Sequence, residues 1–274
     1  QLKDYGFQVF YSSGHQQRAE VMARRIEKAI SFHQQLLDFK PTVALIILSA
    51  RDWEKYISEP VVYGMPHYNE KLNRLIVAAE DNVFWKSFLP ALDQLPESLR
   101  KPIQTTYSNN DGQLTVQAFF DLLAIHELGH AFHMQGGLTM QRNWLGELFA
   151  NILLHTFIAE KEPELLPALT LFPKMVVAGG TKGFKYTSLQ DLQEHYGEIA
   201  RQYPKNYGWY QCRWHAAAAD IYDAGGKKVL QKLWNALKTK KEIMTDDELV
   251  SFLKSMADKS IADMVEYWDR AMVK

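Results

Sequence analysis

The sequence has a single cysteine, Cys212, among its 274 residues. One thiol excludes an intramolecular disulfide and a metal site built from several thiolates. Any metal ion bound by this chain must therefore be held by histidine and carboxylate side chains. Long hydrophobic runs are missing as well, because no stretch of the sequence approaches the ~20 apolar residues that a membrane-spanning helix needs. We therefore expect no membrane span.

The sequence also lacks an excess of charge. Its 31 Lys and Arg residues nearly balance 32 Asp and Glu residues, which gives a net charge of -1. A nucleic-acid-binding surface is usually strongly basic, so we expect no nucleic-acid partner. The hydrophobic content of 47% is that of an ordinary globular protein with a sizeable core. The chain begins with Gln1 rather than Met, so an exported, processed protein is one expectation, and the compartment stays open.

The first part of the chain has the pattern of a small α/β lobe. Residues 7–11 alternate as a strand does, residues 16–37 carry apolar side chains at helical spacing, and residues 43–48 form a short apolar run. This order predicts a β-α-β opening. Further strands are expected at residues 61–65 and 74–79, and short helical turns, broken by prolines, at residues 85–100.

The second part is predicted to be almost wholly helical. Helices are expected at residues 115–135, 143–160, 188–201, 207–224, 228–237, 246–257 and 261–273. Residues 163–185 contain several prolines and glycines, so we expect a connector there, with a cleft wall as the alternative. The predicted fold class is α+β, with a small N-terminal lobe around a mixed sheet (residues 1–113) and a mainly helical lobe (residues 114–274). These lobes are expected to form one compact unit.

The pattern H-E-x-x-H occurs once, in the predicted helix at residues 115–135. His126 and His130 are four residues apart, so a helix presents both imidazoles on one face, where they can bind one metal ion. Glu127 lies about 100° further round the helix and is placed to reach a water molecule on that metal. This motif is typical of zinc hydrolases.

A catalytic zinc ion usually has three protein ligands, so a third must come from elsewhere. The predicted helix at residues 143–160 is apolar nearly all round, and its polar residues Glu147, Asn151 and His155 share one stripe. A buried carboxylate needs a partner, which a metal ion would supply. We therefore predict Glu147 as the third ligand and Asn151 as a partner that orients a ligating histidine. His133 and His155 are expected to be hydrogen-bonded neighbours rather than ligands.

These residues resemble a known family. His126, Glu127 and His130, followed by Glu147 and Asn151, are similar to the H-E-x-x-H and E-x-x-x-D/N pattern of gluzincin metallopeptidases. That family includes thermolysin-like and aminopeptidase-type enzymes of the MA clan. The resemblance covers residues 115–160 well and residues 205–238 weakly. It implies a zincin-like active-site helix between the two lobes and one catalytic Zn²⁺ ion.

The resemblance also implies a zinc-dependent metallopeptidase that acts on a peptide or protein substrate. Glu127 would be the general base. The segment from Tyr210 resembles the helix that carries the transition-state tyrosine of leukotriene-hydrolase-like aminopeptidases, so Tyr210 is the first choice for an oxyanion donor and His215 the second. The amine-binding G-x-M-E-N element of those aminopeptidases has no counterpart with a glutamate here, which leaves endo- and exopeptidase activity open. The alternatives are a catalytically silent binding protein with the gluzincin fold and a zinc hydrolase of a non-peptide amide or ester.

Overall fold

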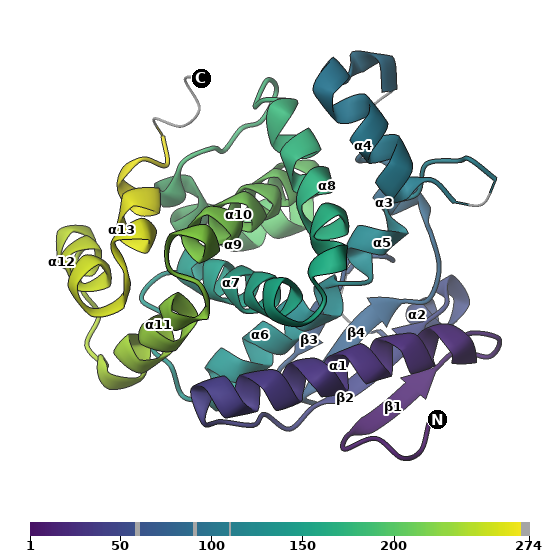
Figure 1. Ribbon diagram of the computed structural model, residues 1–274, viewed down its shortest axis with the longest axis horizontal. Helices are drawn as coiled ribbons and strands as arrows, with labels where there is room; N and C mark the ends of the chain where they lie inside the picture. Colours follow the sequence, from purple (N-terminus) through teal and green to yellow (C-terminus); the bar gives the residue numbers. More distant parts are fainter. Residues whose placement is uncertain (58–60, 90–91, 110, 270–274) are drawn as a thin grey trace.

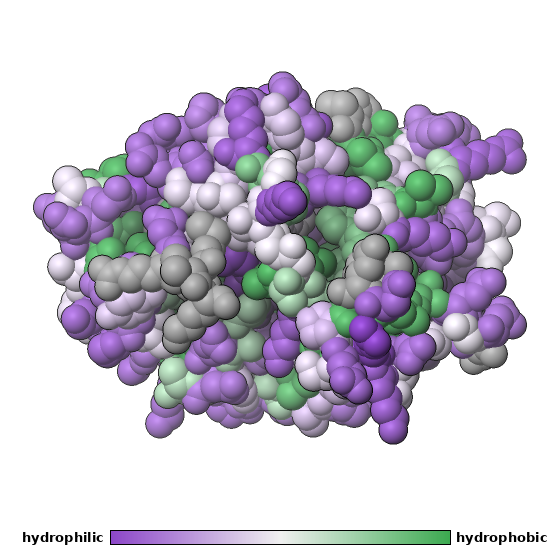
Figure 2. Space-filling model, turned by 90° about the horizontal axis from the view of Figure 1, so that it is seen from above, coloured by the Kyte–Doolittle hydropathy of each residue, from purple (hydrophilic) through white to green (hydrophobic). Residues whose placement is uncertain are grey.

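The fold is α+β, with a small sheet near the N-terminus and a mainly helical remainder, as the sequence predicts (Figure 1). The computed structural model describes residues 1–57, 61–89, 92–109 and 111–269. In these residues no helix is long and apolar enough to cross a membrane. The face seen in Figure 2 is mostly hydrophilic and shows hydrophobic residues in a hollow near its middle.

The sheet has four strands in the order β1-β2-β4-β3. Strands β1 (Gln8–Tyr11), β2 (Ala44–Leu48) and β4 (Arg74–Ala78) are parallel, and β3 (His67–Asn69) is antiparallel at the edge. Parallel neighbours need a crossover, which α1 (Gln16–Leu37) supplies between β1 and β2. The bounds predicted from the sequence for these three parallel strands agree with the structure to within one residue at each end. The predicted bounds of α1 agree as well.

One strand prediction is wrong. The expected strand at residues 61–65 is a turn, in which the Met65 amide donates to the Val62 carbonyl and Gly64 has a φ of 98°. The third strand along the chain is instead β3, two residues further on. The β-branched residues Val61 and Val62 gave the sequence a local strand pattern, but Gly64 allows the chain to turn directly after them.

Both faces of the sheet are covered. Helix α1 and helix α6 (Leu123–Gln135) pack on one face, where Leu45, Leu75 and Val77 join the main core. Helix α2 (Ala50–Tyr56) covers part of the other face, where Trp53 packs with Leu48 and Ile76. Strand β4 is therefore buried from its second residue to its end, and its sequence is a continuous apolar run.

The helical part of the chain surrounds α7. Helix α7 (Asn143–Lys161) is buried from Trp144 to Ile158, as its apolar sequence predicts, and it contacts α6, α9, α10 and α11. Figure 1 shows α7 in the middle of the molecule, between α6 and α10. The remaining helices are α3 (Val83–Lys86), α4 (Glu97–Tyr107), α5 (Gln117–Phe120), α8 (Leu166–Ala178), α9 (Leu189–Gln202), α10 (Pro204–Gly225), α11 (Lys227–Thr239), α12 (Asp246–Phe252) and α13 (Lys259–Glu266). Short turns of other helix types are η1 (Leu92–Gln94), η2 (Pro163–Leu165) and η3 (Leu253–Ala257).

Several helix predictions differ from the structure. The helix expected from residue 207 begins at Pro204, and the one expected at residues 246–257 is α12 followed by η3. The expected helix at residues 115–135 is two helices, α5 and α6, joined by a turn at Asp121 and Leu122. Residues 163–185 are more than a connector, because they contain the 13-residue helix α8 with Pro173 inside it. The last helix ends at Glu266, and the expected end at residue 273 lies outside the described residues.

Candidate metal centre

Helix α6 presents two imidazole rings on its buried side. His126 and His130 lie one turn apart, and their Nε2 atoms are 3.1 Å from each other. This side of α6 faces α7 and a cavity that His126, Glu127 and His215 help to line, and His126 is only 6% exposed. The helical spacing of the motif therefore brings two nitrogen donors together, as predicted from the sequence.

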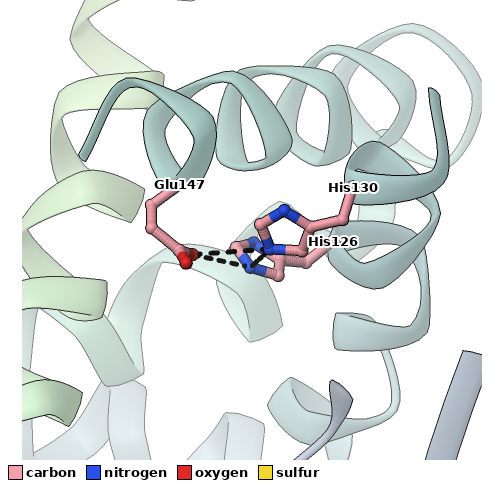
Figure 3. Close-up of side chains that lie close together, drawn as sticks. All are labelled: His126, His130 and Glu147. Carbon is pink, nitrogen blue, oxygen red and sulfur yellow. Dashed lines mark hydrogen bonds and ion pairs between the residues drawn. The ribbon is translucent and has the colours of Figure 1, made fainter. Parts of the chain in front are cut away.

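Glu147 of α7 completes a group of three donors. Its Oε2 atom lies 3.2 Å from Nε2 of His126 and 3.5 Å from Nε2 of His130 (Figure 3). Together with the distance between the histidines, these separations are close to the ~3.3 Å edge of a tetrahedron with metal–ligand bonds of 2.0–2.1 Å. A metal ion bound to all three atoms would keep one tetrahedral position open. These residues can therefore hold a metal ion.

The two helices come close enough for this because their contact residues are small. Gly129 lies between the two histidines of the motif, and a Cβ atom on it would be 2.6 Å from Cα of Ala150. Real Cβ contacts are not that short, so the backbones can approach this closely only with glycine at position 129. Ala150 is three residues after Glu147 on α7. The glycine of the motif thus brings the third donor within reach.

Hydrogen bonds fix the protonation of the histidine rings. Nδ2 of Asn151 donates to the backbone oxygen of Glu147 (3.1 Å), which turns Oδ1 of Asn151 towards Nδ1 of His126 (3.1 Å). His126 therefore carries its proton on Nδ1, and Nε2 has a free lone pair for a metal. Nδ1 of His130 similarly lies 3.0 Å from Nε2 of His133. Burial lowers the pKa of His133 to about 3, so this ring is neutral and accepts the hydrogen bond.

The three donors would repel one another without a cation. Two imidazole nitrogens with their lone pairs directed at each other, 3.1 Å apart, are an unfavourable pair unless a positive charge lies between them. Burial alone would raise the pKa of Glu147, but when His130 and His126 are protonated their charges and hydrogen bonds hold it well below its usual value, and a metal cation between the three residues would act in the same direction. The carboxylate is therefore ionised, which suits a metal ligand.

Three residues that the sequence analysis did not assign surround Glu147. Tyr196 and Tyr207 donate hydrogen bonds to Oε1 of Glu147, and Gln211 donates to Oε2 from 2.8 Å. Burial raises the pKa of both tyrosines well above the usual value, so their hydroxyls stay protonated and act as donors. Tyr207 and Gln211 are four residues apart on α10. That spacing is a weak signal, and Tyr196 comes from α9 with no pattern that points to the site.

Glu127 lies beside the group rather than in it. Its side chain is 6% exposed and lines the same cavity as His126. Burial raises the pKa of Glu127 to about 7, although the charge of His126 acts to lower it. A carboxyl group with a pKa near neutrality can both accept and return a proton.

The structure brings one of the two expected oxyanion donors to the site. The ring of His215 lies 6.2 Å from that of His126, centroid to centroid, and lines the same cavity. Tyr210 is not brought there, because its hydroxyl donates to the backbone oxygen of Ser188 (2.7 Å) and its ring stacks on Trp268. The two residues are five apart on α10, so they point in different directions. Tyr207, three residues before Tyr210, lies on the side of the metal group.

Of the remaining histidines in the motif region, neither is a ligand in this geometry. His133 supports His130 from the next turn of α6. His155 packs against the ring of Tyr222. His133 thus has the expected hydrogen bond beside the site, whereas His155 lies about two turns of α7 beyond Glu147 and contacts Tyr222.

No known protein family matches the sequence, and no solved structure matches it either. Among curated proteins, the chain is similar to ketol-acid reductoisomerase (NADP(+)) of Blochmanniella pennsylvanica (strain BPEN), with 26% identity over 141 residues. The matched region is 50% of this chain and 26% of the reductoisomerase, so the chain spans about a quarter of that protein's length. A similarity this limited does not establish a family.

Proposed function

We propose that this protein is a zinc-dependent metallopeptidase of the gluzincin type. The observation that carries the proposal is that Glu127 lines the same cavity as His126, one member of the group formed by His126, His130 and Glu147. Two histidines and one carboxylate are a donor set of catalytic zinc sites, which keep a fourth position for water or substrate. A closed structural site would instead use four protein ligands.

The residues have separate roles in this mechanism. A zinc ion held by His126, His130 and Glu147 would supply a water molecule with a pKa of ~7 and would polarise the carbonyl group of the bond to be cleaved. Glu127 accepts a proton from the attacking water and passes it to the leaving amine. His215, which lines the cavity beside the group, would donate a hydrogen bond to the oxyanion, and Tyr207 would do so by exchanging Glu147 for the oxyanion as its acceptor. Asn151 and His133 hold the two ligating rings in the required tautomer.

A peptide is favoured as substrate by the position of β3. This strand is at the edge of the sheet and contacts α6, the helix that carries the motif. Edge strands commonly bind extended peptides by adding a strand to the sheet. Glu127 accepts a backbone hydrogen bond from Tyr68 of β3, so an extended substrate beside β3 would pass close to Glu127.

Two other functions remain as alternatives to be separated by experiment. A zinc hydrolase of a non-peptide amide or ester would use the same residues in the same way. A catalytically silent binding protein would have no need of Glu127 as a base. A reductoisomerase function is not proposed, because the sequence contains no G-x-G-x-x-G dinucleotide-binding pattern.

Metal analysis and a peptide library test the proposal. We expect about one zinc ion per chain and cleavage of a mixed peptide library that a chelator abolishes. Glu127→Gln should retain zinc but lose cleavage, because glutamine cannot accept the proton. Glu147→Ala should lose zinc. Undiminished cleavage by Glu127→Gln would overturn the role of the base, and zinc without cleavage of any peptide would favour the alternatives.

A further inference from the structure

A second cavity lies on the side of α10 that faces away from the metal centre. Residues from the end of α8, from α10 and from α13 line it, and Figure 1 shows α10 between the other two helices. Its volume of about 790 Å³ is within the roughly 300–1,000 Å³ that is typical of small-molecule sites. We call this cavity the α10 cleft. Its residues on α10 are Trp209, Arg213, Ala216, Ala217, Asp220 and Ile221.

The α10 cleft is separate from the metal centre. Gln211, which donates to Glu147, lies two residues before Arg213 and therefore about 160° away from it around the helix. The cleft also shares no lining residue with the cavity beside His126. One helix thus presents one face to the metal group and the opposite face to the cleft.

Arg213 lies in the cleft without a full set of partners. Among the described residues that line the cleft, it is the only Lys or Arg. Its Nη2 atom donates to the backbone oxygen of Trp268 (2.8 Å), and its guanidinium group lies 3.6 Å from the centre of the Trp268 ring and 5.3 Å from that of Trp209. Its Nη1 atom is buried and has no hydrogen-bond partner in the part of the chain that the structure describes. A buried donor without an acceptor is unfavourable, so an acceptor on a ligand would stabilise it.

The charge of Arg213 is not neutralised by a carboxylate of the protein. Burial lowers the pKa of Arg213 to about 10, and the charge of Asp269 opposes this shift. The guanidinium group therefore stays protonated at neutral pH. Within the described ranges, Asp269 forms no ion pair with it, because Nη2 is bonded to a backbone oxygen and Nη1 has no partner.

The two carboxylates in the lining leave room for an anion at Arg213. Asp263 already forms an ion pair with Lys259, four residues earlier on α13. Asp220 lies seven residues after Arg213, which places it roughly 10 Å further along the axis of α10. That separation is about one Debye length at physiological ionic strength, so Asp220 repels such an anion only weakly.

The rest of the lining suits an apolar body. The faces of Trp209 and Trp268 lie beside the guanidinium group. Ala216 and Ala217 are too small to fill the space above α10. The other apolar side chains of the lining are Val177, Ala178, Ile221 and Met264. A ligand that covers these surfaces gains from their removal from water.

We propose that the α10 cleft binds a small organic acid, whose carboxylate pairs with Arg213 and whose apolar body lies against the tryptophans and alanines of the lining. A planar guanidinium group matches a carboxylate in shape and charge. The proposal does not rest on the proposed function, because the cleft and the metal centre lie on opposite sides of α10.

An acid and its amide test the cleft by binding. 4-Phenylbutyrate and 4-phenylbutanamide have the same apolar body and differ in charge. Acetohydroxamic acid, which binds zinc, is present in excess so that the carboxylate does not bind at the metal centre. Calorimetry should give at least about tenfold tighter binding for the acid than for the amide. Acetate, which lacks the apolar body, should bind at least about tenfold more weakly than 4-phenylbutyrate. Equal affinities of acid and amide, or no binding of either, would overturn the proposal.

Variants locate the binding. Arg213→Met keeps a long side chain without the charge and should lower the affinity for the acid to that for the amide. Arg201→Met, on the exposed surface of α9, is its control and should leave both affinities unchanged. If Arg213→Met does not fold, Ala217→Leu tests the cleft by filling it and should weaken both compounds. Ala219→Leu lies on the same helix outside the lining and should weaken neither. Wild-type affinity for the acid in Arg213→Met, or for both compounds in Ala217→Leu, would contradict the proposal.

Two further comparisons distinguish this proposal from the proposed function. The preference for the acid should be the same without acetohydroxamic acid. A preference that appears only in its absence would place the carboxylate at the metal centre and refute the cleft. A preference that depends on Arg213, in a protein that cleaves no peptide, would refute the peptidase and leave the cleft.

Discussion

Asn151 holds His126 in the tautomer that a metal ion requires. The side-chain oxygen of Asn151 lies 3.1 Å from Nδ1 of His126, and both groups are buried. The amide nitrogen of Asn151 is engaged elsewhere, with the backbone oxygen of Glu147. The orientation of the amide is therefore fixed, and the second nitrogen of His126 is left for a metal.

This relationship predicts opposite outcomes for two substitutions of similar size. Asn151→Asp keeps an oxygen acceptor for His126 and should retain the metal. Asn151→Leu removes the acceptor and should lower metal affinity by about 10- to 100-fold, the usual effect of losing such a partner. Competition with a chelator of known affinity measures both variants. Equal metal affinity in the two variants would show that the hydrogen bond does not matter.

Gly129 should tolerate no side chain. A Cβ at this position would be 2.6 Å from the backbone of Ala150, so Gly129→Ala must push α6 and α7 apart. We expect a loss of about 1–3 kcal/mol in the free energy of unfolding, typical of overpacking, and weaker metal binding because Glu147 moves away from the histidines. Urea unfolding and metal content measure the two effects.

Gly146→Ala is the matched control for this change. Gly146 lies in α7 beside Glu147, and the nearest atom to a Cβ there would be Nε2 of His133 at 3.6 Å, an ordinary contact. The substitution should leave the metal in place and stabilise the helix by up to about 1 kcal/mol. If both glycine variants behaved alike, the close approach of Gly129 and Ala150 would not be the cause.

Metal binding should contribute directly to stability. A ligand that binds only the folded chain raises the free energy of unfolding by about 1.4 kcal/mol for each tenfold increase in its free concentration above the dissociation constant. We expect the thermal midpoint to rise with added zinc and to fall after treatment with a chelator. Glu127→Gln should respond as the wild type does, and Glu147→Ala should not respond. A midpoint independent of zinc would argue against a site at these residues.

Much of this arrangement could be predicted from the sequence because it depends on local patterns. Helical spacing within one element placed His126 and His130 together, and a polar stripe on an apolar helix pointed to Glu147 and Asn151. The α+β fold followed from the same kind of periodicity. Patterns of this range are set by the geometry of a single helix or strand, which the sequence specifies directly.

The parts that could not be predicted depend on contacts between distant segments. Tyr196 reaches Glu147 only because α9 packs beside α7, and nothing near Tyr196 in the sequence indicates this. Tyr210 matched a pattern by its position, yet the structure turns it towards Ser188 and brings Tyr207 to the metal group. The cavity lined by His126 and Glu127 is likewise assembled from several helices, so no single stretch of sequence predicts it.

A histidine remote from the motif should make stability depend on pH. His33 of α1 is completely buried, with the rings of Phe32, Phe132 and Phe157 around it. Burial lowers the pKa of His33 from 6.5 to about 3. Between these two values the unfolded chain takes up a proton that the folded chain does not, so stability falls as pH decreases through this range. The free energy of unfolding then changes with a slope that approaches about 1.4 kcal/mol per pH unit.

His33→Leu should remove this contribution to the pH dependence. Lowering the pH from 7 to 5 should therefore cost the variant about 2 kcal/mol less in the free energy of unfolding than it costs the wild type, as measured by urea unfolding. All other groups are common to both proteins, so parallel pH profiles would show that His33 becomes protonated within the folded protein.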